Sequence, residues 1–460
     1  MADQATAQEF DILVLGGGSG GYATALRAVQ LGLTVGLVEK AKLGGTCLHN
    51  GCIPTKALLH SAEVADHARD GAKYGVNVEF QSIDMTAVNA YKDGIIAGKF
   101  KGLQGLIKGK GITVIEGEGK LTAPDTITVN GTAYKGKNIV LATGSYSRSL
   151  PGLEIGGRVI TSDEALKMDY VPKSVIVLGG GVIGVEFASV WKSFGVDVTI
   201  VEGLPSLVPN EDASIIKVLE RTFKKRGIKF NTGTFFQGVE QDNDGVKVTL
   251  VDGKTFEADL LLVAVGRGPS TAGLGFEEAG VTIDRGFVIT NERLHTGVGN
   301  VYAVGDIVPG VQLAHRGFQQ GIFVAEEIAG MKPVVVDDIN VPKVTFCDPE
   351  IASVGYSEKA AKEKFGEDRV ESTEYNLAGN GKSAILGTGG IIKFVREKDG
   401  PVVGVHMIGT RVGEQIGEAQ LIVNWEAYPE DVAGLIHAHP TQNEALGEAA
   451  MALAGRPLHG

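Results

Sequence analysis

The hydrophobic residues of this chain form short continuous runs, separated by segments in which apolar residues recur at helical spacing. Phe10–Leu15 and Thr34–Val38 are two such runs, and residues 22–31 between them have the helical pattern. The same order returns around Ser174–Leu178 and Val198–Val201. A short apolar run bounded by turn residues predicts a buried strand, and strands that alternate with helices predict parallel sheets. The pattern therefore indicates an α/β fold.

A glycine-rich turn follows the first of these strands. Gly16, Gly18 and Gly21 fit the G-x-G-x-x-G spacing between a strand and a helix. In this motif the first glycine makes the tight turn, the second lets a pyrophosphate approach the backbone, and the third lets helix and strand pack closely. Glu39 ends the second strand, about where an acid meets a ribose hydroxyl. These residues predict a dinucleotide site, at which the helix N-terminus stabilises the anion.

The same motif occurs a second time. Gly179, Gly181 and Gly184 follow the strand Ser174–Leu178, and Glu202 ends the next strand. The first glycine and the acid are 23 residues apart in both copies. The chain therefore carries two predicted dinucleotide sites, the arrangement that connects a flavin to a nicotinamide.

Further strands are predicted after each unit. Ile139–Ser145 and Leu261–Arg267 match each other, and we expect each to close one nucleotide-binding sheet. Val301–Asp306 is another strand, whose terminal acid either reaches a ligand hydroxyl or lies in a solvated turn. From Pro342 onward the chain has no glycine fingerprint, so this block should do something other than bind a nucleotide. Its strands are expected at Ile351–Tyr356, Gly390–Val395 and Val402–Ile408.

Two cysteines follow the first glycine motif. In an undistorted helix the Cα atoms of Cys47 and Cys52 would lie roughly 8–9 Å apart, beyond the ~6.8 Å limit for a disulfide. A bridge therefore needs a bent segment, for which Gly51 supplies backbone freedom and Pro54 lacks a helical N–H. A strained, accessible disulfide tends to be labile or catalytic. The pair is either a redox dithiol or two buried cysteines that act as small hydrophobic residues.

Length, charge and cysteine content limit the class of protein. A chain of 460 residues fits about three domains. The formal net charge of −12 argues against nucleic acid or an anionic membrane as a partner. Three cysteines cannot make a disulfide framework, and Cys347, which lacks positive neighbours, is interpreted as structural. The sequence contains no recognisable metal-ligand cluster, targeting segment or bilayer-spanning apolar run, so we expect a soluble, cytoplasmic protein.

A histidine-rich segment lies near the end of the chain. His439 is followed by Glu444 and then by an alanine-rich amphipathic helix, in whose first turn Pro440 is expected to lie. A histidine held against a carboxylate is a general base near neutral pH. The alternative is a histidine that caps the helix.

Taken together, these motifs resemble those of the flavoprotein disulfide reductases, and most closely the branch that oxidises dihydrolipoyl groups. The resemblance covers nearly the whole chain. It implies an FAD domain built from two stretches, an inserted NAD domain and a C-terminal α+β dimerisation domain, with two Rossmann-like domains as in glutathione reductase. The motifs are Gly16–Gly21, Gly44–Lys56, Gly179–Glu186, Gly305–Asp306 and His437–Thr441. The expected domains are 1–150 (FAD, first part), 151–270 (NAD), 271–341 (FAD and central, second part) and 342–460 (dimerisation).

The resemblance also implies an activity. This would be FAD-dependent oxidation of dihydrolipoyl groups to lipoyl groups with reduction of NAD+, as the shared component of 2-oxoacid dehydrogenase complexes. The expected partner is a dihydrolipoyl group on an acyltransferase or carrier protein of such a complex. Cys47 matches the thiol that meets the substrate, and Cys52 matches the thiol nearest the flavin. Lys56 matches a lysine beside the flavin, paired with Glu186.

His439 and Glu444 match the acid/base dyad of the family, in which the histidine serves the disulfide of the partner subunit. A homodimer is then a requirement of the chemistry. Further expected cofactor contacts come from the same resemblance. Those to FAD are Gly16, Gly18, Gly21, Glu39, Gly119, Thr143, Gly144, Ser145, Asp306, Gln312, Leu313, Ala314 and His315, and those to NAD are Gly179, Gly181, Gly184, Glu186, Glu202 and Gly266. Lys40, Gly45, Thr46 and Lys56 complete the expected cofactor-binding set.

The chain departs from the family pattern at a few positions. His49-Asn50 replaces the usual Asn-Val, and Thr55 replaces a common Ser. Gln442-Asn443 replaces the usual Leu-Ser, which touches the active-site end and leaves the identity of the substrate more open than the reaction class.

Three alternative functions fit the sequence less well. A related reductase that acts on another small disulfide normally takes NADPH and needs arginines for the 2′-phosphate, and residues 203–209 after Glu202 contain none. A mercuric reductase is disfavoured because the C-terminus lacks its cysteine pair. A non-catalytic binding subunit should have lost a cysteine or His439, and all are present.

Overall fold

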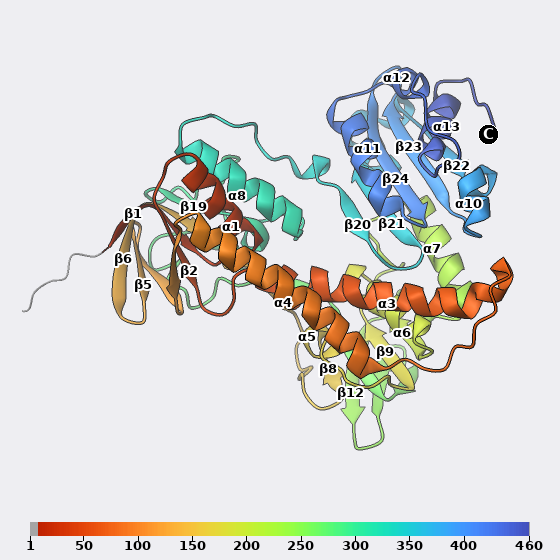
Figure 1. Cartoon of the computed structure of the whole chain (residues 1–460), viewed down its shortest axis with the longest axis horizontal. Coiled ribbons are helices and arrows are strands. Elements are labelled where there is room, and N and C mark those ends of the chain that lie inside the picture. Colours follow the sequence, from red (N-terminus) through yellow and green to blue (C-terminus); the bar gives the residue numbers. More distant parts are fainter. Residues whose placement is uncertain (1–7, 460) are drawn as a thin grey trace, which may run out of the picture. The chain divides into compact units, whose positions relative to one another are not determined.

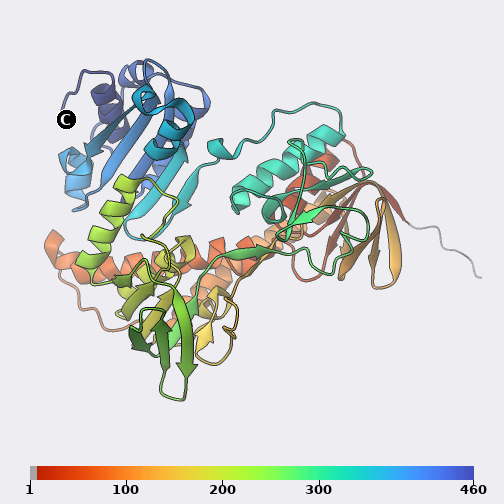
Figure 2. The ribbon, with the colours of Figure 1, turned by 180° about the vertical axis from the view of Figure 1, so that it is seen from behind.

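The computed structural model describes residues 8–459, and the chain divides into two compact units (Figures 1 and 2). Each unit is assembled from segments that are distant in sequence. The first unit comprises Met1–Ala57, Thr86–Arg148 and Gly266–Asp338, and the second comprises Leu58–Met85, Ser149–Val265 and Ile339–Gly460.

The first unit is built on a seven-stranded sheet. Its central strand β1 pairs in parallel with β2 and with β6, so that Leu13 lies between Gly36 and Ile139. These strands are buried on both faces, as their continuous apolar sequences predict. The strands are β1 (Glu9–Leu15), β2 (Val35–Glu39), β3 (Thr113–Glu116), β4 (Gly119–Ala123), β5 (Thr126–Val129), β6 (Thr132–Leu141) and β19 (Val301–Ala303).

Two helices of the first unit, α1 (Ser19–Gln30) and α8 (Ala314–Ile328), pack side by side (Figure 1). Their contact depends on small residues. A β-carbon added to Gly321 would lie 2.9 Å from the backbone nitrogen of Thr24, and one added to Gly20 would lie 2.8 Å from the Val304 side chain. Both helices belong to the same compact unit as the first glycine motif.

The second unit contains a parallel sheet whose central strands are arranged as in the first unit. Its parallel sheet has the order β11-β10-β9-β15-β8, and β9 lies between β10 and β15 as β1 lies between β2 and β6. The predicted repeat of the nucleotide-binding unit is therefore confirmed. Its elements are β8 (Val159–Ile160), β9 (Ser174–Leu178), α6 (Val182–Ser193), β10 (Asp197–Val201), α7 (Ala213–Arg226), β11 (Lys229–Asn231) and β15 (Leu260–Val263).

The C-terminal part of the second unit is an antiparallel five-stranded sheet of order β20-β21-β24-β23-β22. Helices α11 (Val412–Asn424) and α13 (Glu444–Leu453) pack on it around a common apolar core. The predicted α+β domain is confirmed. Its strands are β20 (Lys343–Thr345), β21 (Glu350–Gly355), β22 (Val370–Asn376), β23 (Ile391–Glu397) and β24 (Val402–Gly409).

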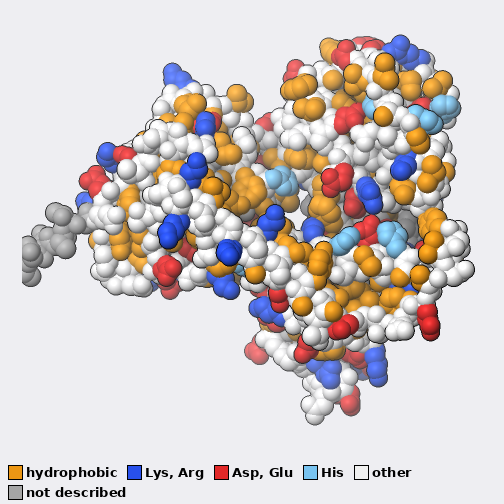
Figure 3. All heavy atoms as spheres, in the orientation of Figure 1, with side chains coloured by type: hydrophobic (Ala, Val, Ile, Leu, Met, Phe, Trp, Pro, Cys, Tyr) orange, Lys and Arg blue, Asp and Glu red, His pale blue; other side chains and the backbone are white. Residues whose placement is uncertain are grey.

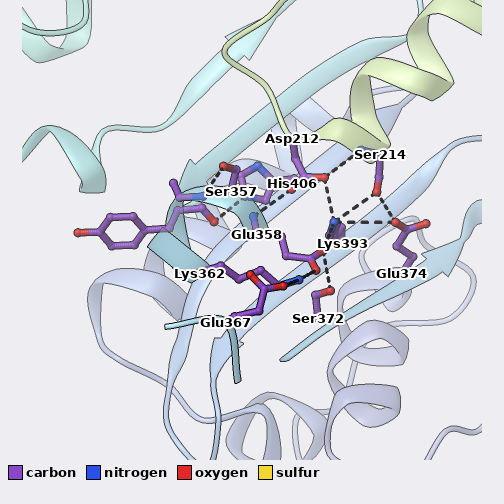
Figure 4. Close-up of polar contacts among 12 residues, drawn as sticks. Asp212, Ser214, Ser357, Glu358, Lys362, Glu367, Ser372, Glu374, Lys393 and His406 are labelled. Atoms are coloured by element: carbon purple, nitrogen blue, oxygen red, sulfur yellow. Dashed lines mark hydrogen bonds and ion pairs between the residues drawn. The ribbon is translucent and has the colours of Figure 1, made fainter. Parts of the chain in front are cut away.

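A buried lysine joins α7 to this sheet (Figure 4). Lys393 of β23 is 5% exposed and lies 3.0 Å from Asp212, which caps α7, and 2.7 Å from Glu358. Lys393 also contacts Ser214, whose hydroxyl donates to Glu374. Because an unpaired buried charge is costly, these contacts hold the start of α7 against the sheet.

The remaining elements connect these layers or cover their edges. They are α2 (Gly45–His49), α3 (Cys52–Asp70), α4 (Met85–Gly109), β7 (Ser145–Ser147), α5 (Ser162–Ala165), β12 (Phe236–Gln241), β13 (Val246–Leu250), β14 (Thr255–Ala258), β16 (Arg267–Pro269), β17 (Ile283–Asp284), β18 (Phe287–Val288), α9 (Glu358–Phe365), α10 (Gly381–Ile385) and α12 (Pro429–Ala433). Within residues 8–459, no helix has the length and apolar character needed to cross a membrane.

Candidate active site

The first glycine motif forms a tight turn between β1 and α1. A β-carbon added to Gly16 would overlap the Ala142 carbonyl at the end of β6, and one added to Gly21 would overlap the carbonyl of Gly16. At Gly18 the nearest atom to such a carbon would be the Gly45 Cα, 3.9 Å away. The first and third glycines are therefore required by packing, whereas the second leaves space over the start of α1, which no side chain caps. This space suits an anionic pyrophosphate.

Glu39 closes this turn. Its Oε2 accepts a hydrogen bond from the Gly17 N–H at 2.7 Å, and its Oε1 accepts one from the Ala41 N–H at 2.8 Å. The carboxylate thus lies beside the glycine loop, fixed from both sides by the backbone. Each oxygen keeps a further lone pair for a ribose hydroxyl.

The second motif repeats this geometry residue for residue. Added β-carbons would overlap the Ala264 carbonyl at Gly179 and the Gly179 carbonyl at Gly184, and would meet no atom within 4 Å at Gly181. The start of α6 has no side-chain cap. Glu202 accepts hydrogen bonds from the N–H groups of Gly180 at 2.6 Å and Leu204 at 2.8 Å. Both sites therefore have the open backbone, free helix end and fixed acid that a dinucleotide requires.

The two cysteines lie on either side of a break between two helices. Cys47 is in α2, and Cys52 is the first residue of α3. Asn50 and Gly51 separate the helices, so the predicted bend is confirmed, and a β-carbon on Gly51 would lie only 3.0 Å from the Thr46 carbonyl. Both cysteines are partly exposed, unlike Cys347, which is fully buried. The exposure favours the redox interpretation over that of two small core residues.

The two sulfurs interact with each other. A hydrogen bond to Cys52, followed by burial and the charge of Cys52, raises the pKa of the Cys47 thiol, and the positive charge of Lys56 opposes the shift. Deprotonating Cys47 would place a second thiolate beside the first. Ionisation of one of these two thiols therefore opposes ionisation of the other.

The dithiol segment is fastened to the first glycine loop. The Gly44 N–H donates to the Gly17 carbonyl at 2.9 Å. Gly45, with φ +57°, lies so close to Gly18 that an added β-carbon would come within 2.8 Å of the Gly18 Cα. Both contacts join backbone to backbone, so the spacing between the nucleotide loop and α2 is fixed without side chains.

The strand ends predicted as FAD contacts meet in the first unit. The Ser145 hydroxyl donates to Asp306 Oδ2 at 2.6 Å, and the Gln312 side chain donates to the Asp306 carbonyl at 3.2 Å. Thr143 donates to the Ser270 carbonyl at 2.6 Å. Arg267 donates through Nε to the Ser145 hydroxyl at 2.8 Å and through Nη2 to its carbonyl at 2.7 Å. Arg267 is not among the predicted site residues, although it directly follows Gly266 at the end of a predicted strand.

The remaining residues predicted to contact FAD or NAD lie in several different settings. A β-carbon on Gly119 would lie 2.6 Å from Leu15, so this glycine makes room in the core. Gly266 belongs to the first compact unit, where its carbonyl accepts the Arg148 N–H at 3.0 Å. Leu313 caps α8, which starts at Ala314 and contains His315, and Lys40 is an exposed residue directly after β2.

Glu186 lies in α6 and is only 3% exposed. Its Oε1 accepts a hydrogen bond from the Phe346 N–H at 2.8 Å. Lys56, its expected partner, belongs to the other compact unit. The pairing of these two residues stays a prediction.

His439 and Glu444 form a dyad in the C-terminal domain. His439 Nδ1 lies 2.8 Å from Glu444 Oε1, and the Thr441 N–H donates to Glu444 Oε2 at 2.7 Å. Burial raises the pKa of the Glu444 carboxyl, but the Thr441 N–H and then His439 outweigh burial and lower it. The carboxylate therefore stays charged and fixes the tautomer of the ring.

The His439 side chain is 78% exposed, and histidine side chains are visible at the surface of the C-terminal domain in Figure 3. Among residues 8–459, none donates to or accepts from its Nε2. Nε2 of the ring is thus available for a further contact, while Nδ1 is hydrogen-bonded to Glu444.

The prediction that Pro440 lies in the first turn of the following helix is wrong. Helix α13 begins at Glu444, with Asn443 as its N-cap. Residues 440–443 form a loop instead, because Glu444 accepts the Thr441 N–H and holds the preceding chain beside the helix end.

Two family models match the chain. The pyridine nucleotide-disulphide oxidoreductase model matches residues 10–321, and the dimerisation domain of the same family matches residues 341–450. Together they cover both nucleotide-binding units and the C-terminal sheet.

Individual relatives are similar over almost the whole chain. The mitochondrial dihydrolipoyl dehydrogenase of Pisum sativum is 41% identical, covering 98% of this chain and 93% of the relative. A dihydrolipoyl dehydrogenase of Bacillus subtilis is 40% identical, covering 98% of this chain and 100% of the relative. A leghemoglobin reductase of Glycine max is also 40% identical, covering 98% of this chain and 88% of the relative. Among solved structures, LpdA of Mycobacterium tuberculosis has a TM-score of 0.89 at 26% identity, covering 97% of this chain and 100% of the other.

Proposed function

This chain belongs to the pyridine nucleotide-disulphide oxidoreductase family, and on that premise we propose that it oxidises dihydrolipoyl groups to lipoyl groups and reduces NAD+ to NADH. It is a flavin-dependent oxidoreductase whose cofactors are FAD and NAD(H). The observation that carries the proposal is the Cys47–Cys52 pair fastened beside the first glycine loop. The similarity to dihydrolipoyl dehydrogenases over 98% of the chain supports this substrate class.

The two cysteines have different roles in the proposed reaction. A dihydrolipoyl thiolate attacks the sulfur of Cys47 in the disulfide, and Cys52 leaves as a thiolate. The second substrate thiolate then attacks the first substrate sulfur, which releases the lipoyl disulfide and leaves Cys47 as a thiol once protonated. The raised pKa of the Cys47 thiol beside Cys52 supports a Cys47 that ends the exchange protonated. Bound FAD supplies the redox chemistry that connects a dithiol to a nicotinamide.

His439 is the proposed base that removes the proton from each substrate thiol in turn, passing one proton to Cys47 and releasing the other to solvent. Glu444 holds its Nδ1 and stabilises the imidazolium. The exposure of the ring and the match of residues 341–450 to a dimerisation domain support a site completed between two subunits. A homodimer follows from this arrangement, and Lys56 with Glu186 is proposed to lie beside the flavin.

The proposed nucleotide assignment gives FAD to the first glycine motif and NAD to the second. Glu202 supports NAD over NADP, because a fixed carboxylate accepts from a ribose 2′-hydroxyl and repels a 2′-phosphate. Residues 203–209 contain no arginine to reverse that preference. We also propose the domain division 1–150, 151–270, 271–341 and 342–460, and a lipoyl-bearing acyltransferase or carrier protein of a 2-oxoacid dehydrogenase complex as partner.

One set of assays tests the function. The FAD-loaded dimer should reduce NAD+ with dihydrolipoamide, with kcat/KM orders of magnitude higher than with NADP+. Oxidation of NADPH by glutathione disulfide and other small disulfides should be slow. A preference for NADPH and a small disulfide would favour the related reductase instead. An absence of turnover with every pair would favour a binding subunit.

A further inference from the structure

Glu418 of α11 contacts both ends of the segment that carries His439. Its Oε1 lies 2.8 Å from His437 Nε2, and its Oε2 accepts a hydrogen bond from Asn443 Nδ2 at 2.7 Å. One carboxylate thus holds residues 437 and 443 together. We propose that Glu418 and Asn443 are positioning residues that fix His439 for proton transfer, an inference that rests on the proposed function.

The His437 end of the segment is enclosed by two helices. The side chain of His437 is 12% exposed. Its ring lies against α13, where a β-carbon on Gly447 would come within 2.6 Å of His437 Nδ1. The ring is therefore held between Glu418 of α11 and the backbone of α13, and it cannot shift without breaking the contact to Glu418.

The other end is fastened at three successive residues. The Thr441 carbonyl accepts a hydrogen bond from Asn380 Nδ2 at 3.0 Å, and Gln442 Nε2 donates to the Thr410 carbonyl at 2.8 Å. Asn380 and Gln442 are both buried. Asn443 adds the bond to Glu418, directly before the helix that begins with Glu444. The backbone on both sides of His439 is thus anchored to the body of the domain.

His439 needs such anchoring because little else restrains it. Its side chain is 78% exposed, and Glu444 is the group that holds its ring. The position of the ring therefore follows the position of the backbone in residues 437–444. A misplacement of about 1 Å can cost ~10²-fold in rate when a reacting group must be aligned.

This geometry gives Gln442-Asn443 a role different from the one that the sequence suggested. There the pair left the identity of the substrate open, since it stands where the family usually has Leu-Ser. Gln442 instead bonds to Thr410, and Asn443 bonds to Glu418. Both side chains make hydrogen bonds within the domain. We therefore attribute the difference from the usual Leu-Ser to anchoring of residues 437–443 and not to selection of the substrate.

The test compares two activities of the FAD-loaded dimer. Dihydrolipoamide:NAD+ turnover requires the proton transfer by His439, whereas NADH:ferricyanide turnover takes electrons without thiol exchange. Glu418→Ala and Asn443→Ala should lower kcat of the first about 10–10²-fold and leave KM for NAD+ and the second activity within about twofold. A parallel loss of both activities would mean a general structural defect and would overturn the proposal. Unchanged dihydrolipoamide turnover would also overturn it.

Two further variants sharpen the result. Glu418→Gln keeps an oxygen that can accept from Asn443 and gains an N–H that can donate to the His437 ring, so it should restore most of the activity that Glu418→Ala loses. Equal impairment of the two would overturn the role of these contacts. Glu414→Ala is the matched control, an exposed glutamate one turn earlier on α11, and it should behave as the wild type.

Hydrogen exchange separates this inference from the proposed function. In the dimer, amides of residues 437–443 should exchange faster in Glu418→Ala and Asn443→Ala than in Glu414→Ala, whichever substrate the protein uses. Unchanged exchange would overturn the positioning role. A wild-type protein that does not oxidise dihydrolipoamide, but whose variants show the faster exchange, would refute the proposed function alone.

Discussion

Gly45 lies against Gly18 so closely that a β-carbon on Gly45 would come within 2.8 Å of the Gly18 Cα. This contact joins the segment that carries Cys47 to the turn that is open to a pyrophosphate. The dithiol and the first nucleotide loop are therefore a single backbone structure, and a change at one should be felt at the other.

Substituting Gly45 with alanine should weaken FAD binding. The substitution combines strain at φ +57° with an overlap against the Gly18 backbone, which cannot move away as a flexible side chain would. We expect loss of bound flavin, measured by absorbance per protomer, and a lower thermal midpoint. Gly32→Ala is the matched control, because Gly32 has φ +84° but nothing within 4 Å of an added β-carbon. It should show only backbone strain of about 1–2 kcal/mol and retain its flavin.

Cys47→Ser and Cys52→Ser should both abolish lipoamide turnover but should differ in colour. Only a Cys52 thiolate is proposed to lie against the flavin and donate charge to it. Cys47→Ser should therefore show a long-wavelength absorption band that grows as pH rises and Cys52 loses its proton, and Cys52→Ser should not. Cys347→Ser, which leaves both redox cysteines in place, should have the wild-type spectrum. Interchanged spectra would reverse the two roles.

Mixed dimers test whether the site lies between subunits. Cys47→Ser homodimers should be inactive, and His439→Ala should cost roughly 10²–10⁴-fold. After subunit exchange, half of the dimers are mixed, and each has one site with both an intact disulfide and an intact histidine. Activity should recover to about a quarter of the wild-type rate, a consequence of two-fold symmetry.

A control for this experiment mixes Cys47→Ser with Cys52→Ser, which leaves every site with a damaged disulfide and should give no recovery. If mass spectrometry detects the mixed dimers and the first pair also stays inactive, each site is built within one chain.

Removing the charge of Lys393 should destabilise the second unit. Lys393→Met leaves Asp212, which is 2% exposed, without its cation, and loss of one partner of a buried pair costs about 3–5 kcal/mol. Chemical denaturation should report this loss in the free energy of unfolding. Lys359→Met is the control, since the Lys359–Glu363 pair is 3.9 Å apart with side chains 88% and 67% exposed, and it should have almost no effect.

The charged groups around Lys393 should make the free energy of unfolding fall at acidic pH. Hydrogen bonding to Lys393 lowers the pKa of Glu358 from 4.5 to about 2 in the folded protein, against opposition from burial. A carboxyl whose folded pKa is depressed stabilises the fold above its unfolded pKa, and the contribution is lost as pH falls through the folded value. The free energy of unfolding should therefore decline between about pH 4.5 and pH 2, and less steeply in Lys393→Met. Equal slopes in the two proteins would contradict this assignment.

The parts of the molecule that sequence could predict are those with a local pattern. The glycines at 16, 18 and 21 and the acid at 39 are set by the spacing of one strand, turn and helix, and their copies at 179–202 follow the same geometry. The bend at Gly51 is likewise local. In each case the residues that act together are within about one βαβ unit of one another.

Contacts between distant segments could not be predicted in this way. Ser145 and Asp306 are 161 residues apart, and Lys393 and Asp212 are 181 apart. Glu418 gives no motif, because one glutamate on an amphipathic helix is an ordinary surface residue until the fold brings residues 437 and 443 to it. The sequence does not determine the position of Pro440, because proline is compatible with both a first helical turn and a loop, and a contact from Glu444 decides between them.

The carboxylates of Glu39 and Glu202 each accept a hydrogen bond from one N–H of the glycine loop and from the N–H two residues after the glutamate itself. The curvature of each loop is thus maintained by bonds internal to the chain. A nucleotide that enters such a loop meets donors already aligned, and little conformational entropy is lost when it binds. The two sites are in this sense preorganised, so affinity at each can be tuned by groups around the loop without redesigning the turn itself.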